Sequence, residues 1–105
     1  MERQTEKGER IVWLAGMPLA LHYTVNSMCA VEDAVGGALD EVFDRQFTAA
    51  RLLLWGGMLD RQPGMTLDQA GELVGRHLSG GGTLEEIVEH CAEGLRRAGF
   101  FAAAQ

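Results

Sequence analysis

An apolar segment in the middle of the chain limits the folds that are open to it. From Arg51 to Leu59 the sequence reads RLLLWGGML, and from about Gln46 onward the apolar residues fall almost all round a helix rather than along one stripe. A helix of this kind is stable in water only where other elements cover it on most sides. A chain of 105 residues has room for one domain. We therefore expect a single domain over residues 1–105, with this helix as the hub against which the other elements pack.

Two adjacent glycines, Gly56 and Gly57, lie inside this expected helix. Each costs about 1 kcal/mol relative to alanine in a helix interior. Such a cost is tolerated where glycine lets a neighbouring backbone come close, or where the helix bends or ends. The sequence leaves both explanations open.

The N-terminal part of the chain has the pattern of a β-hairpin. Residues 11–14 (IVWL) favour a strand, Gly16 and Pro18 indicate a turn, and residues 19–23 (LALHY) alternate between larger apolar residues and Ala20 or His22. A lone hairpin is marginal in water, so it must pack on helices or pair with another sheet. Residues 1–9 are polar, and we expect them to be disordered.

Three further helices follow from capping and periodicity. Thr24 or Asn26 can cap a helix over residues 25–36 that ends at Gly36. The segments TLDQ at Thr66 and TLEE at Thr83 have the form of capping boxes. At about 100° per residue, the apolar faces of these three helices are expected at Val25, Met28, Cys29, Glu32 and Val35; at Leu67, Ala70, Val74 and Leu78; and at Leu84, Ile87, Val88, Cys91, Leu95 and Ala98. The predicted fold class is α+β, mainly α, with a short N-terminal β-hairpin packed on a bundle of about four helices.

One charged residue lies on an expected apolar face. Glu32 shares that face with four apolar or thiol side chains, and Arg51 begins the apolar segment of the central helix. A buried charge needs a partner, so we predict that these two side chains form an ion pair that fixes helix register. The alternative is that both reach solvent at the edge of the core.

Composition excludes several classes of protein. The chain carries a formal net charge of -6, which disfavours nucleic acids and anionic membranes as partners. The last two expected helices could pass for a helix-turn-helix, but the second carries four glutamates that DNA phosphates would repel: Glu85, Glu86, Glu89 and Glu93. We interpret these glutamates as a solvated acidic face.

The interrupted apolar segment near the N terminus lacks a basic leader and is too short to span a membrane, so we expect a cytoplasmic protein.

No catalytic or cofactor motif is present in the sequence. His22, His77 and His90 lack the spacing of metal ligands, and LSGGGT lacks the end of a phosphate-binding loop. The two cysteines, Cys29 and Cys91, are predicted to be buried thiols without a disulfide or metal role. We therefore predict that the protein is not an enzyme and needs no cofactor or metal.

Several segments, in their order along the chain, resemble a known family. They are LHYTVNSMCAVEDAVG, then FTAARLLLWGGMLDRQPGMTLDQAGELV, then LEEIVEHCAEGLRRAGFF. The points of match are the Tyr-Thr-x-Asn helix start, the glutamate of the same helix (Glu32), the arginine that begins the apolar helix, and the Thr-Leu before an Ala-Gly helix. From Leu14 to about Phe101 the chain resembles the small tail assembly chaperones of long-tailed phages, prophages and gene transfer agents.

This resemblance implies a partner and a place of action. Such proteins bind the long, apolar, helical tape measure protein and keep it soluble until tail tube subunits displace them. The implied location is the cytoplasm of the bacterial host, and the implied partners are the tape measure protein and the tail tube protein. The unpaired edges of a lone hairpin also predict a homo-oligomer.

The residues that would contact such a client cannot be assigned from the sequence. Part of the neighbourhood of Leu52–Leu59, together with Phe100 and Phe101, could be left open for a client helix, whereas the simpler interpretation is that the central helix is wholly buried. Five methionines would supply a surface that adapts to different side chains. The main alternative function is a small acidic helical adaptor that binds a defined globular partner.

Overall fold

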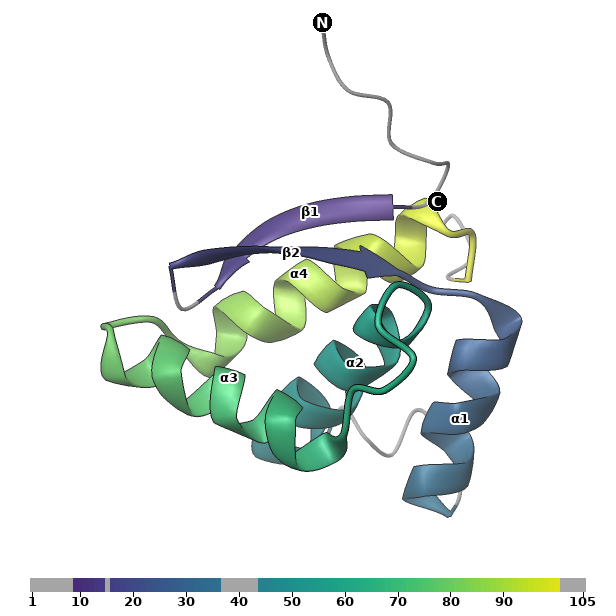
Figure 1. Cartoon of the computed structure of the whole chain (residues 1–105), viewed down its shortest axis with the longest axis horizontal. Coiled ribbons are helices and arrows are strands. Elements are labelled where there is room, and N and C mark those ends of the chain that lie inside the picture. The colour runs from purple at the N-terminus through teal and green to yellow at the C-terminus, as the bar shows by residue number, and fades with distance from the viewer. Residues whose placement is uncertain (1–8, 15, 37–43, 101–105) are drawn as a thin grey trace, which may run out of the picture.

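The computed structural model describes residues 9–14, 16–36 and 44–100 and contains a hairpin followed by four helices (Figure 1). The strands are β1 (Glu9–Leu14) and β2 (Met17–His22), and the helices are α1 (Val25–Val35), α2 (Gln46–Leu59), α3 (Leu67–Ser79) and α4 (Leu84–Arg97). The fold is α+β and mainly α, so the predicted class is confirmed. The disorder expected for residues 1–9 falls outside the described residues, except that Glu9 already belongs to β1.

The two strands of the hairpin are antiparallel, and their side chains alternate between two faces. The register pairs Val12 with Leu19 and Leu14 with Met17. Gly16, in the turn, has a φ of +77°, a conformation that glycine adopts without a steric cost. One face is buried through Val12, Leu14, Leu19 and Leu21, and it packs on α2 and α4, as Figure 1 shows. The hairpin therefore depends on the helices for its burial, as the sequence predicts.

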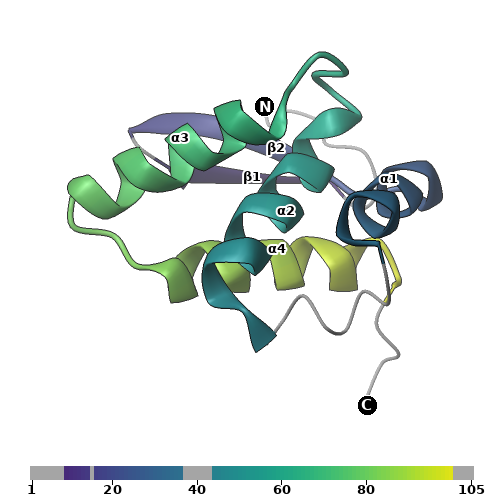
Figure 2. The ribbon, with the colours of Figure 1, turned by 90° about the horizontal axis from the view of Figure 1, so that it is seen from below.

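Helix α2 is the centre of the domain. It contacts β2 and each of the other three helices, and Figure 2 shows it crossing between α1, α3 and α4. Its buried residues lie on most sides of the helix: Ala49, Ala50, Leu52, Leu53, Leu54, Gly56, Gly57 and Met58. The prediction of a hub helix is confirmed from Ala49 to Met58, whereas the first turn is open to solvent and leaves Phe47 exposed.

The paired glycines of α2 make room for two different neighbours. A β-carbon on Gly56 would lie 2.5 Å from a methyl carbon of Val31 on α1, and one on Gly57 would lie 2.8 Å from the ring of Tyr23. Helix α2 continues through both positions to Leu59. Close packing is therefore the correct explanation of the two glycines, although the groups that approach are side chains rather than a backbone.

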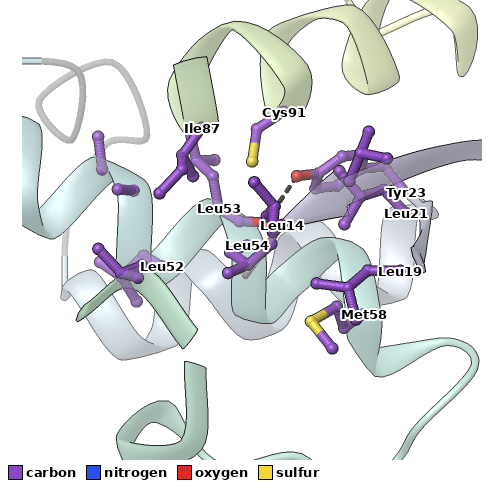
Figure 3. Packing of buried hydrophobic residues seen from close by; sticks show 14 of the residues in the cluster. Leu14, Leu19, Leu21, Tyr23, Leu52, Leu53, Leu54, Met58, Ile87 and Cys91 are labelled. Atoms are coloured by element: carbon purple, nitrogen blue, oxygen red, sulfur yellow. Dashed lines mark hydrogen bonds between the residues drawn. The ribbon is translucent and has the colours of Figure 1, made fainter. Parts of the chain in front are cut away.

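Tyr23, which follows β2, fills the space between α2 and α4. Its ring also meets Gly94 of α4, where a β-carbon would lie 2.9 Å from the ring carbon Cε2. The hydroxyl donates a hydrogen bond of 2.6 Å to the backbone carbonyl of Leu53 (Figure 3). The side chain is thus buried with its polar group satisfied, and glycine on both sides lets the two helices approach the ring.

Capping fixes where three of the helices begin. Thr24, Thr66 and Thr83 each accept a hydrogen bond from the backbone of the third helical residue, whose side chain in turn accepts from the backbone N–H of that threonine. The two predicted boxes are confirmed, and Thr24 rather than Asn26 caps α1. Gly36, in a left-handed conformation, caps the C-terminal end of α1, as predicted. Helix α4 has Ala98 as its C-cap, and Gly99 follows with a φ of +87°.

Helix α1 is rotated by about one residue from the predicted orientation. Its buried residues are Ser27, Met28 and Val31, whereas Val25, Cys29 and Glu32 are exposed. The prediction that Cys29 is buried is therefore wrong. Ser27 can be buried because its hydroxyl donates to the Thr24 carbonyl and accepts from the Thr24 N–H.

Replacing glycine by alanine should have opposite effects at Gly94, which packs against Tyr23, and at Gly75, which has no neighbour near a β-carbon. Gly94→Ala should lower the free energy of unfolding by about 1–2 kcal/mol, because overpacking outweighs the gain in helix propensity. Gly75→Ala should raise it by about 0.5–1 kcal/mol, because nothing lies near a β-carbon at this exposed position of α3. Urea denaturation of both variants measures the difference, and equal stabilities would contradict this packing of Tyr23.

Candidate functional site

The titratable residues of the described part of the chain do not gather into a metal site. No group of three or more His, Cys, Asp or Glu side chains within residues 9–14, 16–36 and 44–100 could hold a metal ion. In the same residues, no helix is long and apolar enough to cross a membrane.

The predicted ion pair between Glu32 and Arg51 is not formed. Both residues are exposed, and the structure shows no ion pair between them. The aliphatic part of Arg51 lies against Gly71 of α3, whereas Glu32 lies on α1, a helix that does not contact α3. The rotation of α1 removes the reason for the pair, because Glu32 no longer faces the core.

The buried thiol of Cys91 lies beside Tyr23 in the core and is not a reactive group. Burial raises the pKa of the Cys91 thiol to about 12, although a hydrogen bond with Tyr23 works in the other direction. Burial, followed by the interaction with Cys91, raises the pKa of Tyr23 well above its usual value. A thiol that stays protonated is a poor nucleophile, so this pair has a structural role.

A shallow groove lined by methionines opens between the tip of the hairpin, the end of α2 and one side of α3. Met17, Met58 and Met65 line it together with Leu19 and Leu73, and its rim carries the polar or charged side chains of Gln62, Gln69, Glu72 and Arg76. Met58 is buried and forms the floor, Met65 is half-buried, and Met17 is 37% exposed. We call this surface the methionine groove. Its volume of about 230 Å³ is below the range of roughly 300–1,000 Å³ typical of small-molecule sites, which suits single side chains of a polypeptide.

A hydrogen bond from the side chain of Trp55 holds one wall of the methionine groove in place. The ring nitrogen of Trp55 on α2 donates a hydrogen bond of 2.9 Å to the backbone carbonyl of Met65. This bond ties the segment before α3 to the central helix. The sequence did not assign Met17 or Met65 to a site, because residues from three separate segments form the groove only after folding.

A second and larger groove lies along the polar side of α4. It has a volume of about 710 Å³, and its lining includes Trp13, His77, Glu86, Glu89, Glu93 and Arg96. His77 Nε2 lies 2.8 Å from Glu86 Oε1, and both Arg96 and Arg97 pair with Glu93. We call it the tryptophan groove.

Local partners hold two of the carboxylates in this groove in their charged form. The backbone N–H of Thr83, and then the ring of His77, keep the pKa of Glu86 below its usual value. Hydrogen bonds from Arg96, and then from Arg97, do the same for the pKa of Glu93. The prediction of a solvated acidic face holds for Glu85, Glu86 and Glu89, which are exposed, whereas Glu93 is half-buried. The sequence gives one indication of this groove: the alternation of side chains along the hairpin directs Trp13 away from the core.

The two phenylalanines near the C-terminal end are only partly described. Phe100 is exposed and follows the end of α4, while Phe101 lies outside the described residues. Their assignment to a client surface therefore stays a prediction.

Comparison with known proteins adds no assignment, because no family model, no curated protein and no solved structure matches the chain.

The buried Tyr23 and Cys91 predict a loss of stability in alkali. In the unfolded chain the thiol ionises at its ordinary pKa of 9.0, whereas in the folded protein it stays protonated to about pH 12, so unfolding releases a proton above pH 9. Raising the pH from about 8 to about 10.5 should therefore remove about 2 kcal/mol of stability through Cys91, and Tyr23 should add to this above pH 10.

Urea denaturation at both pH values measures this loss. Cys91→Ala should reduce the difference between the two pH values by about 2 kcal/mol, whatever its effect on stability at neutral pH. Cys29→Ala is the matched control, because it removes an exposed thiol. An unchanged pH dependence in Cys91→Ala would show that the thiol is accessible in the folded protein.

Proposed function

We propose that this protein is a tail assembly chaperone of the kind found in long-tailed phages, prophages and gene transfer agents. In this role it binds the apolar, helical tape measure protein and keeps it soluble in the cytoplasm of the bacterial host during tail assembly. The resemblance of the segments from Leu14 to about Phe101 suggests the family. The confirmed hairpin and four helices are consistent with the fold that we inferred from the same segments.

The observation that carries the proposal is the methionine groove. Three of the five methionines of the chain meet there. Methionine side chains are unbranched and polarizable, so they repack around apolar side chains of different shape. A chaperone that holds a long helical client has to accept many such side chains along one stripe, which an adaptable groove with a polar rim allows.

The charge of the protein also supports a holding role. A net charge of -6 makes complexes repel one another and so opposes aggregation of an apolar client. No other strand among the described residues pairs with the hairpin, so pairing between protomers through its edges would give a homo-oligomer.

Client binding should depend on the methionine groove. Met17→Asp should weaken the binding of tape measure fragments at least about tenfold, because it places a charge where apolar side chains are expected to dock. Val25→Asp is the control: it removes an apolar side chain that is also exposed, on α1 and away from the groove. Isothermal titration of wild type should also show a negative heat-capacity change and little salt dependence.

Co-expression provides the wider test of the function. The protein should raise the soluble yield of a co-expressed tape measure protein, and Met17→Asp should reduce this effect while Val25→Asp should not. If the tape measure fragments stay equally insoluble with and without the protein, and no complex elutes in size exclusion, the chaperone proposal is wrong. The small acidic adaptor with a globular partner would then be the better hypothesis.

Self-association is tested separately by light scattering at high micromolar concentration. We expect a dimer or larger assembly, because edge strands tend to pair and no further strand in the described part of the chain pairs with this hairpin. A proline at an exposed position of β1, Ile11→Pro, should dissociate it by removing a backbone donor from the strand. A strict monomer of the wild-type protein would exclude this part of the proposal.

A further inference from the structure

The outer face of the hairpin is apolar and lies open to solvent. Ile11 and Trp13 point away from the core on β1, with exposed fractions of 42% and 65%, and the residues opposite them on β2 are Ala20 and Pro18. These four residues form what we call the outer hairpin face. A tryptophan exposed to this extent beside other apolar side chains is typical of an interaction surface.

The tryptophan groove gives this face a charged border. Trp13 lines the groove from the hairpin side, and α4 contributes three carboxylates, Glu86, Glu89 and Glu93, against one permanent cation, Arg96. Two histidines, His77 and His90, also line it, so the border is acidic on balance. Glu86 and Glu93 have ion-pair partners within the protein, whereas the structure shows no ion pair between Glu89 and another described residue. The groove thus brings together an accessible indole ring and a carboxylate that can accept a cation from outside.

These two features fit one kind of side chain. Arginine and lysine stack on an indole ring through a cation–π interaction, and their head groups pair with carboxylates. The overall charge of -6 steers cationic segments toward the protein. We propose that the outer hairpin face and the tryptophan groove dock a basic amphipathic segment of a partner protein, with its apolar side chains on the hairpin and its Arg or Lys side chains between Trp13 and Glu89.

Charge complementarity favours this occupant over a second copy of the chain. A second copy carries the same net charge of -6, and a two-fold contact on this face would bring two acidic borders together. The edge pairing proposed above uses main-chain groups at the strand edges, whereas docking here uses side chains on the outer face. The inference does not depend on the methionine groove or on the identity of the client.

Fluorescence anisotropy with a labelled peptide tests the docking surface on the full chain. The probe is a short amphipathic helical peptide of Leu, Ala and Arg, measured in about 50 mM salt so that screening is weak. We expect Glu89→Lys to weaken binding about fivefold or more, because an attraction becomes a repulsion. Trp13→Ala should weaken it by a similar factor through loss of the cation–π contact. Both positions are exposed, so circular dichroism should show an unchanged fold.

Glu32→Lys is the matched control, because it changes the net charge by the same amount at an exposed position on α1. It should weaken binding less than about twofold. Three results would overturn the proposal: an equal loss in Glu32→Lys and Glu89→Lys, equally tight binding of a peptide with Glu in place of each Arg, or no effect of Trp13→Ala. If the wild-type protein binds no peptide and the Trp13→Ala variant no longer self-associates, the outer hairpin face is instead a contact between two copies of the chain.

Discussion

The packing of Tyr23 between two glycines is the interaction on which the rest of the domain depends. The ring lies at the end of the hairpin and separates α2 from α4, with Gly57 on one side and Gly94 on the other. Its hydroxyl is satisfied by the Leu53 carbonyl, so an aromatic ring can occupy the centre of the core without an unpaired polar group. This one side chain therefore joins the hairpin to the two helices that cover it.

The same constraint explains how α1 is placed. Gly56, next to Gly57, receives Val31, so α1 packs on the turn of α2 that also holds Tyr23. The face of α1 that can reach α2 is the one with Ser27, Met28 and Val31. Glu32 and Cys29 consequently turn toward solvent, which is why neither has the buried environment that the sequence predicts for it.

The hairpin gives the molecule two different surfaces because side chains on a strand alternate. Val12 and Leu14 enter the core, and this directs Ile11 and Trp13 outward on β1. At the tip, Met17 reaches a groove whose floor is Met58 of α2. One apolar surface therefore has an adaptable, methionine-lined character, and the other has an acidic border. The partners that we propose for them differ accordingly: an apolar helix for the first surface and a basic segment for the second.

The sequence by itself determined the type and order of the elements, because these depend on local patterns. The alternation of residues 19–23, the Thr66 and Thr83 capping boxes and the all-round apolar character of α2 each act within a few residues of the chain. Tertiary structure decided the rest. The exposure of Cys29, the separation of Glu32 from Arg51, and the meeting of Met17 with Met65 depend on how α1, the hairpin and α3 are oriented on α2. That orientation is set by contacts between side chains far apart in sequence, such as Tyr23 with Gly94, which no local pattern reports.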